Sequence, residues 1–153
     1  AGIDIQWFNM VGMPGATLEH DWKTVRCNAE LGVKHAWCSI MSPYPKTEIM
    51  ERACEAGWLE RDEIRDGFFP ESYFMPSKMR IPDKRRVTNL HHLFNLCVRY
   101  PRLEPLFRLL TSLPLEKPFE LFFKIHHALS LRGYYRFRWR SYFRFLWYCR
   151  RMY

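Results

Sequence analysis

Apolar runs alternate with amphipathic stretches over the first part of the chain. Residues 5–11 form a mostly apolar run of strand length, which ends at Gly12-Met13-Pro14-Gly15, where Gly and Pro interrupt regular structure. Thr17 then occupies an N-cap position before apolar residues at helical spacing, and Gly32 stops that pattern. The pattern predicts a buried strand at 5–11 and an amphipathic helix that begins after Thr17.

The same order of elements repeats once. Residues 33–41 form a second apolar run, which Pro43-Tyr44-Pro45 breaks. Thr47 then caps a second helix with Ile49, Met50, Ala53 and Cys54 on its inner face, ending at Gly57. Strand, helix, strand and helix in this order are typical of parallel βαβ packing, so we expect an α/β fold.

The pattern changes after Gly57. Residues 67–82 are interrupted by Gly and Pro and show no periodicity, which predicts a linker between an α/β part at 1–66 and a helical part at 83–153. The helical part should contain three helices, at 83–100, at 103–113 and, with Pro118 in its first turn, up to about Gly133. Residues 134–153 predict a basic aromatic helix, with one stripe formed by Arg136, Arg140, Arg144 and Arg151.

Charge divides the chain in the same way. Residues 1–77 hold 7 Lys and Arg against 12 Asp and Glu, whereas residues 78–153 hold 17 against 4. A basic half favours a polyanionic partner. For residues 134–153 we consider three interpretations, in falling order of preference: packing within the helical extension, peripheral contact with a membrane, and contact with nucleic acid.

Cysteine and histidine spacing predicts no metal site. The five cysteines are far apart and form neither CxxC nor CxxxCxxC, which suggests a reducing compartment, the cytoplasm. We expect Cys27, Cys38 and Cys54 to be small buried residues. Adjacent helical residues point about 100° apart, so we expect structural or surface roles for the pairs His91-His92 and His126-His127. No apolar run approaches the roughly 18 residues of a membrane span. The start at Ala1, without an initiator Met, suggests a truncated or processed polypeptide.

Two turn motifs carry a resemblance to a known family. The first is Phe8-Asn9-Met10-Val11-Gly12-Met13-Pro14-Gly15-Ala16-Thr17, and the second is Met41-Ser42-Pro43-Tyr44-Pro45-Lys46-Thr47-Glu48, followed by Glu55-Ala56-Gly57-Trp58-Leu59. Together, over about residues 1–60, they resemble the radical SAM enzymes, in particular the branch with a cobalamin-binding domain. The resemblance implies the last βαβα units of a partial (β/α) barrel, here followed by an all-α basic extension.

The resemblance also implies site residues. Met10 and Gly12 match positions that pack near the adenine of S-adenosylmethionine, and Pro14 and Gly15 match the turn behind them. The family's PYPGT element, at the mouth of the barrel, corresponds to the following positions: Pro43, Tyr44, Pro45 and Thr47. The chain departs from the family at Ala16, where Glu is usual, and at Lys46, where PYPGT has Gly. No catalytic residue is assigned.

The implied function is that of a C-terminal portion of an enzyme that cleaves S-adenosylmethionine reductively to modify an unactivated carbon, by methyl transfer or cyclisation. The family's three-cysteine motif lies on the first barrel strand, and Cys27, Cys38 and Cys54 do not match it. We therefore expect the iron–sulfur ligands and any cobalamin domain in the N-terminal part of the same polypeptide, a small-molecule or lipid-like substrate, and no activity in this chain alone. The alternative is a non-enzymatic basic helical module that binds an anionic membrane or nucleic acid.

Overall fold

The computed structural model describes residues 5–61 and 77–134, together with 141, 142, 144 and 147. Most of the predicted linker and most of the predicted basic aromatic helix at 134–153 lie outside the described residues. Within the described ranges, no helix combines the length and the apolar content that crossing a bilayer requires.

A parallel strand–helix–strand unit opens the fold. Strands β1 (Gln6–Val11) and β2 (His35–Ile40) pair in parallel, in a register that runs from Gln6 opposite His35 to Val11 opposite Ile40. Helix α1 (Leu18–Glu30) connects them, with Thr17 as its N-cap. The predicted order and the α/β class are therefore confirmed. Two strands do not by themselves define a barrel.

The remaining elements are helical, as the sequence predicted. Helix α2 (Glu48–Glu55) follows β2, with Met50 and Ala53 buried. The helical part comprises α3 (Lys84–Arg99), the 3-10 helix η2 (Pro101–Leu103), α4 (Glu104–Ser112) and α5 (Glu116–Tyr134). These bounds agree with the three predicted helices.

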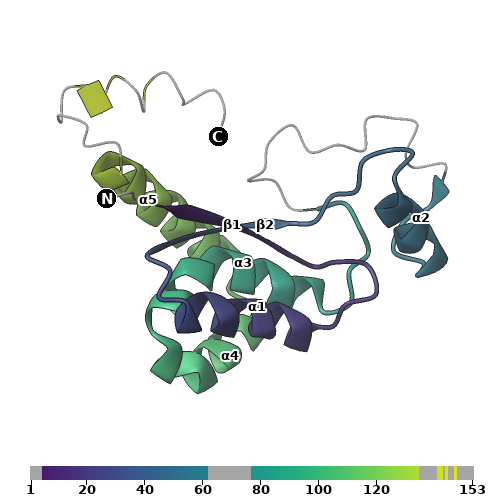
Figure 1. Ribbon diagram of the computed structural model, residues 1–153, viewed down its shortest axis with the longest axis horizontal. Coiled ribbons are helices and arrows are strands. Elements are labelled where there is room, and N and C mark those ends of the chain that lie inside the picture. Colours follow the sequence, from purple (N-terminus) through teal and green to yellow (C-terminus); the bar gives the residue numbers. More distant parts are fainter. Residues whose placement is uncertain (1–4, 62–76, 135–140, 143, 145–146, 148–153) are drawn as a thin grey trace.

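One hydrophobic core joins the α/β part to the helical part. Helices α1 and α3 lie side by side beneath the sheet, and α4 lies beyond them (Figure 1). Trp22 of α1 and Phe94 of α3 are each 1% exposed. Met79 and Ile81, from the end of the predicted linker, are buried in the same cluster. The described residues on both sides of residues 62–76 therefore share a core.

The prediction of a buried strand at 5–11 was wrong. Phe8 is 75% exposed and Met10 is 51% exposed, whereas Val11 is fully buried. The reason is that α1 and α3 cover one face of the sheet, and successive side chains of a strand point to opposite faces.

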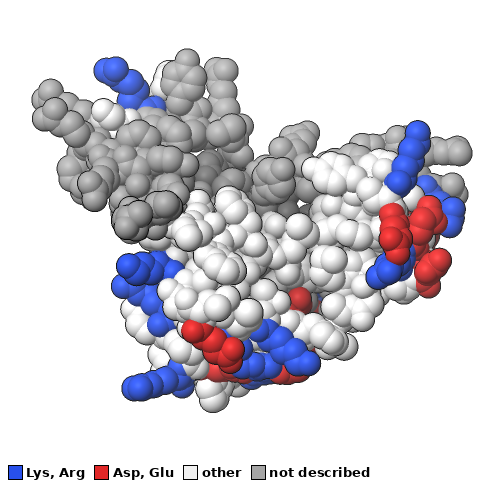
Figure 2. Space-filling view, viewed as in Figure 1, with Lys and Arg blue, Asp and Glu red and all other residues white. Residues whose placement is uncertain are grey.

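Figure 2 shows charged side chains over α1 and α4 and over α2, with uncharged side chains between these groups, around the sheet.

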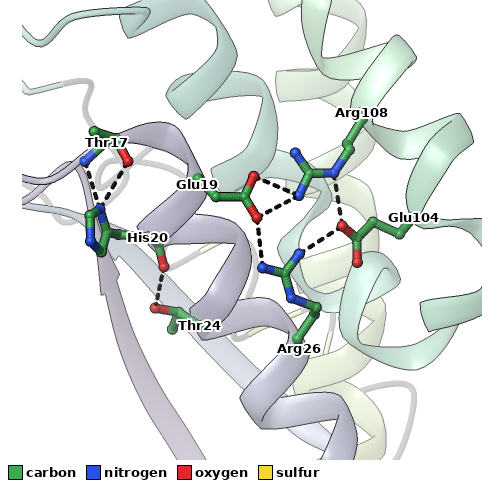
Figure 3. Close-up of polar contacts among 7 residues, drawn as sticks. All are labelled: Thr17, Glu19, His20, Thr24, Arg26, Glu104 and Arg108. Carbon is green, nitrogen blue, oxygen red and sulfur yellow. Dashed lines mark hydrogen bonds and ion pairs between the residues drawn. The ribbon is translucent and has the colours of Figure 1, made fainter.

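An ion-pair network fastens α4 to α1 (Figure 3). Arg26 contacts Glu19 at 2.7 Å and Glu104 at 2.9 Å, and Arg108 contacts Glu104 at 2.8 Å. The guanidinium of Arg108 also lies over the Trp22 ring, 4.7 Å from its centroid. Hydrogen bonds from Arg26 and Arg108 lower the pKa of the Glu19 carboxyl. Since the Glu19 side chain is exposed, each of its two ion pairs should contribute under about 1 kcal/mol.

Candidate functional site

The two predicted turn motifs leave the sheet side by side. Val11 and Ile40 are partners at the carboxyl ends of β1 and β2. The Met41 N–H then donates a hydrogen bond to the Val11 carbonyl at 2.9 Å. The loops that follow the two strands, residues 12–17 and 42–47, therefore begin next to each other. In parallel α/β folds, this edge of the sheet is where binding sites form.

Both the backbone conformation and the close packing of neighbouring side chains require glycine at position 12. Gly12 is buried with φ +71°, in the left-handed region that favours glycine. A Cβ atom here would lie 3.0 Å from Ile81 Cδ1 and 3.3 Å from Val87 Cγ1. Gly15 also has a positive φ, +79°, but a Cβ there would meet nothing within 4 Å. The close approach at Gly12 is thus to side chains of this chain, and its approach to a nucleoside stays a prediction.

Asp21 holds the first loop in place. Its Oδ1 accepts a hydrogen bond from the Gly12 N–H at 3.1 Å, and the residue is 4% exposed. Burial raises the pKa of this carboxyl to about 6, and the Gly12 hydrogen bond opposes that shift. This role of Asp21 was not predicted from the sequence. The available signal was an acid in the first turn of the helix that follows the loop, where it can reach back to the loop amides.

Side chains at the N-terminus of α1 form local hydrogen bonds with one another and with the backbone. Nδ1 of His20 accepts a hydrogen bond from the Thr17 N–H at 3.1 Å and lies 2.9 Å from the Thr17 hydroxyl oxygen (Figure 3). The Thr24 hydroxyl donates to the His20 carbonyl at 3.2 Å. The loop and the first turns of the helix therefore form one hydrogen-bonded unit.

Asn9 establishes which face of β1 is covered. Its amide pairs with that of Asn28 in α1, at 2.7 Å and 3.2 Å, and it also donates to the Trp37 carbonyl at 3.0 Å. Because side chains alternate along a strand, Phe8 and Met10 belong to the opposite face. Met10, a predicted cofactor-binding residue, therefore lies on the face away from α1.

The second loop contains a strained residue. Pro43 is buried, whereas Tyr44 and Pro45 are exposed. Lys46 has φ +62°, although it is not glycine. The Thr47 hydroxyl donates to the Tyr44 carbonyl at 2.6 Å and accepts from the Met50 N–H at 3.4 Å, so this threonine closes the loop and caps α2.

A second cluster lies toward the amino ends of the strands. A cavity of about 60 Å³ lies between β2, α3 and α5, and its lining includes His91, His92, Trp37 and Phe123. The His91 and Phe123 ring centroids are 4.9 Å apart, and those of Trp37 and His127 are 4.6 Å apart. The histidine pairs thus contribute to an aromatic cluster that docks α5 onto α3 and β2.

The histidines of this cluster are held neutral. His91 is 4% exposed, and neither of its ring nitrogens makes a hydrogen bond in the described part of the chain. Burial lowers its pKa to about 3, and the nearby backbone of Cys38 offsets this only partly. Burial also lowers the pKa of His127 to about 4. A ring that cannot ionise without losing its packing acts here as a structural side chain.

The described residues do not form a metal centre. Among them, no group of three His, Cys, Asp or Glu side chains could hold a metal ion. Cys38 is buried, as predicted, whereas Cys54 is only partly buried. Cys97 is also buried, and burial raises the pKa of its thiol to about 12. Cys27 is exposed, so the prediction of a buried thiol was wrong there. The iron–sulfur cluster that the resemblance implies therefore has no fitting ligand set in this part of the chain.

Comparison with known proteins adds no relative: the chain has no significant match to a protein family, to a curated protein or to a solved structure. The resemblance to radical SAM enzymes consequently depends on the two sequence motifs alone.

Proposed function

We propose that this chain is the C-terminal portion of a radical SAM enzyme, in which it provides a wall for the adenosine part of S-adenosylmethionine and part of the substrate mouth. The observation that carries the proposal is the meeting of the two motif loops at the carboxyl ends of two paired parallel strands. Sites in (β/α) barrels are built at this edge.

The conformation of Lys46 supports the same assignment. Its φ of +62° falls in the region that glycine adopts without steric cost. The family's PYPGT element has Gly at this position. The departure at Lys46 therefore changes the side chain and keeps the backbone shape that the motif specifies.

Met10 and Tyr44 are the side chains best placed to touch a ligand. They are 51% and 61% exposed, and each belongs to one of the two motifs. The thioether of Met10 offers a polarizable apolar contact for the adenine ring. Asp21 fixes the loop behind Met10 through the Gly12 amide. When bound, the cofactors supply the radical chemistry, and this chain positions the nucleoside.

We assign the exposed side chains of β1, on the face away from α1, to contact with the rest of the polypeptide. Within the described residues β1 pairs with β2 alone, and Phe8 and Met10 are exposed on the face away from α1. Parallel sheets are normally covered on both faces. An N-terminal barrel half would pair with the free edge of β1 and enclose this face, and it would also carry the cluster ligands and any cobalamin domain. The substrate class, a small or lipid-like molecule, remains part of the proposal.

Met10 provides the cleaner binding test, because changes at Gly12 would also disturb Ile81. In a polypeptide that carries this chain together with a CxxxCxxC motif, Met10→Glu should weaken S-adenosylmethionine binding about 10-fold or more, by placing a carboxylate against the adenine. Leu31→Glu is the matched control, since Leu31 is 59% exposed at the end of α1. Equal affinities of the two variants in equilibrium dialysis would remove Met10 from the site.

Two further observations test the assignment to the C-terminal portion. The coding sequence upstream of Ala1 should contain CxxxCxxC roughly 100 or more residues away, as a barrel of about 200 residues or more requires. The 153-residue chain alone should bind no iron–sulfur cluster after anaerobic reconstitution, because it lacks three suitably spaced thiolates. A stoichiometric cluster on this chain would contradict the proposal.

A further inference from the structure

We propose that α5 docks on an anionic lipid surface. The docking surface is an apolar stripe formed by Leu121, Ile125 and Leu129, at i, i+4 and i+8 of the helix. These side chains are 61%, 53% and 56% exposed. Residues four apart lie on one face of a helix, so the three form a continuous row. This inference is independent of the proposed enzymatic function.

The stripe belongs to a helix that is held in place by other side chains. Phe123 of α5 contacts His91 of α3, and both Phe123 and His127 contact Trp37 of β2. Phe119 packs against the hydrophobic core. The core thus uses a separate set of α5 residues and leaves the stripe exposed. An apolar row on a firmly docked helix is typical of an interaction surface.

The positive charge of the sequence after Glu120 favours an anionic partner. After Glu120 the sequence contains eight Lys and Arg and no Asp or Glu. The Tyr142 hydroxyl donates a hydrogen bond to the Ala128 carbonyl, so Tyr142 lies against α5 beside the position that precedes Leu129. Arg144 and Trp147 are exposed, the latter at 70%. Exposed aliphatic, Trp and Arg side chains in the same part of the chain are the residue types that a membrane interface selects, because apolar groups enter the acyl boundary and cations meet anionic headgroups.

The stripe also distinguishes lipid from nucleic acid. Nucleic acids bind proteins mainly through phosphate contacts and base stacking, and neither kind of contact buries exposed Leu and Ile side chains. Burial of these side chains in an acyl layer removes apolar area from water. We therefore expect the stripe and the cations to contribute to lipid binding together.

The test is co-sedimentation of the full chain with vesicles of phosphatidylcholine alone or with one third phosphatidylserine. The variant Leu121→Ser/Ile125→Ser/Leu129→Ser should bind the anionic vesicles about 10-fold or more weakly than the unchanged protein. The matched control is Leu103→Ser/Leu106→Ser/Leu109→Ser, which removes side chains that are 46%, 48% and 60% exposed on η2 and α4. This control should bind like the unchanged protein.

A second part of the experiment tests the contribution of charge. Binding of the unchanged protein should require phosphatidylserine and decrease at high salt, and Arg144→Glu should weaken it further. Equal loss in the α5 and control variants, or no binding to anionic vesicles at low salt, would overturn the proposal. The proposal would also be overturned if the α5 variant changed the oligomeric mass and not lipid binding, because the stripe would then serve only self-association. Binding to an oligonucleotide and not to vesicles would overturn it as well.

Discussion

The two ends of the sheet bury ionisable side chains with opposite consequences. At the carboxyl ends, burial raises the pKa of Asp21 to about 6, with the Gly12 N–H as hydrogen-bond donor. Toward the amino ends, burial lowers the pKa of His91 to about 3 among aromatic rings. Desolvation disfavours the charged form in both cases, so the acid retains its proton and the base loses it. The carboxyl end is organised by backbone hydrogen bonds and the amino end by ring packing.

The opposite shifts predict opposing pH slopes. Asp21 binds its proton more tightly in the folded state, so its contribution to stability falls as the pH rises from about 4 to 6. His91 binds its proton more weakly in the folded state, so its contribution falls as the pH decreases below about 6.5. Between pH 4 and 6 the two effects partly cancel. Single substitutions at either end should reveal them separately.

The largest expected effect distinguishes two glycines of the same loop. Gly12→Val should lower the free energy of unfolding by about 3–4 kcal/mol, since it combines a left-handed backbone with overpacking against Ile81 and Val87. Gly15→Val should cost only about 1–2 kcal/mol, because its φ is also positive but its surroundings are open. Urea unfolding measures both. Equal losses would show that the contacts around Gly12 do not constrain the loop.

Asp21→Asn tests the carboxyl end. Asn keeps an oxygen that can accept the Gly12 hydrogen bond and removes the buried charge. The stability of the variant relative to the unchanged protein should therefore increase by about 2–3 kcal/mol between pH 4 and pH 7. Thermal unfolding across this range gives the difference. A constant difference between the two proteins would show that Asp21 is not held protonated by burial.

The sequence determined the elements more completely than it determined the site. Caps and periodicity placed α1 after Thr17 and α2 after Thr47, because these signals are local. Whether β1 would be covered on both faces depends on how many elements pack around it, which its own apolar residues do not encode. The exposure of Phe8 followed from this.

The site residues show the same limit. The sequence predicted the parallel strand order, and the structure shows that this order brings the two loops together at the carboxyl ends of the strands. The link between Asp21 and Gly12 was not predicted, since it needs the direction of one side chain across a turn. The aromatic cluster around His91 depends on α5, which lies about 30 residues further along the chain. Contacts of that kind cannot be inferred from local spacing.

His91→Phe tests the amino end. Phe keeps an aromatic ring in the cluster and has no site for a proton. From pH 7 to pH 5 the unchanged protein should lose about 2 kcal/mol through His91, and the variant should lose that much less. The direction is opposite to that of Asp21→Asn, so each variant serves as the control for the other in the same pH series. Parallel slopes for the unchanged protein and His91→Phe would contradict this account of the cluster.

The smallest expected effect compares one substitution at the two ends of β2. Lys46, after the strand, has φ +62°, whereas Lys34, before it, is also exposed but has no positive φ. Lys46→Gly should raise the free energy of unfolding by about 0.5–1 kcal/mol, because relief of the left-handed strain exceeds the entropy that glycine adds to the unfolded chain. Lys34→Gly removes the same charge and should lower stability by about 0.5–1 kcal/mol, through the entropy effect alone. Chemical denaturation of the two variants separates these outcomes by sign. If Lys46→Gly is no more stable than Lys34→Gly, the loop after β2 does not store the strain that its backbone indicates, and the structural support for the PYPGT assignment is lost.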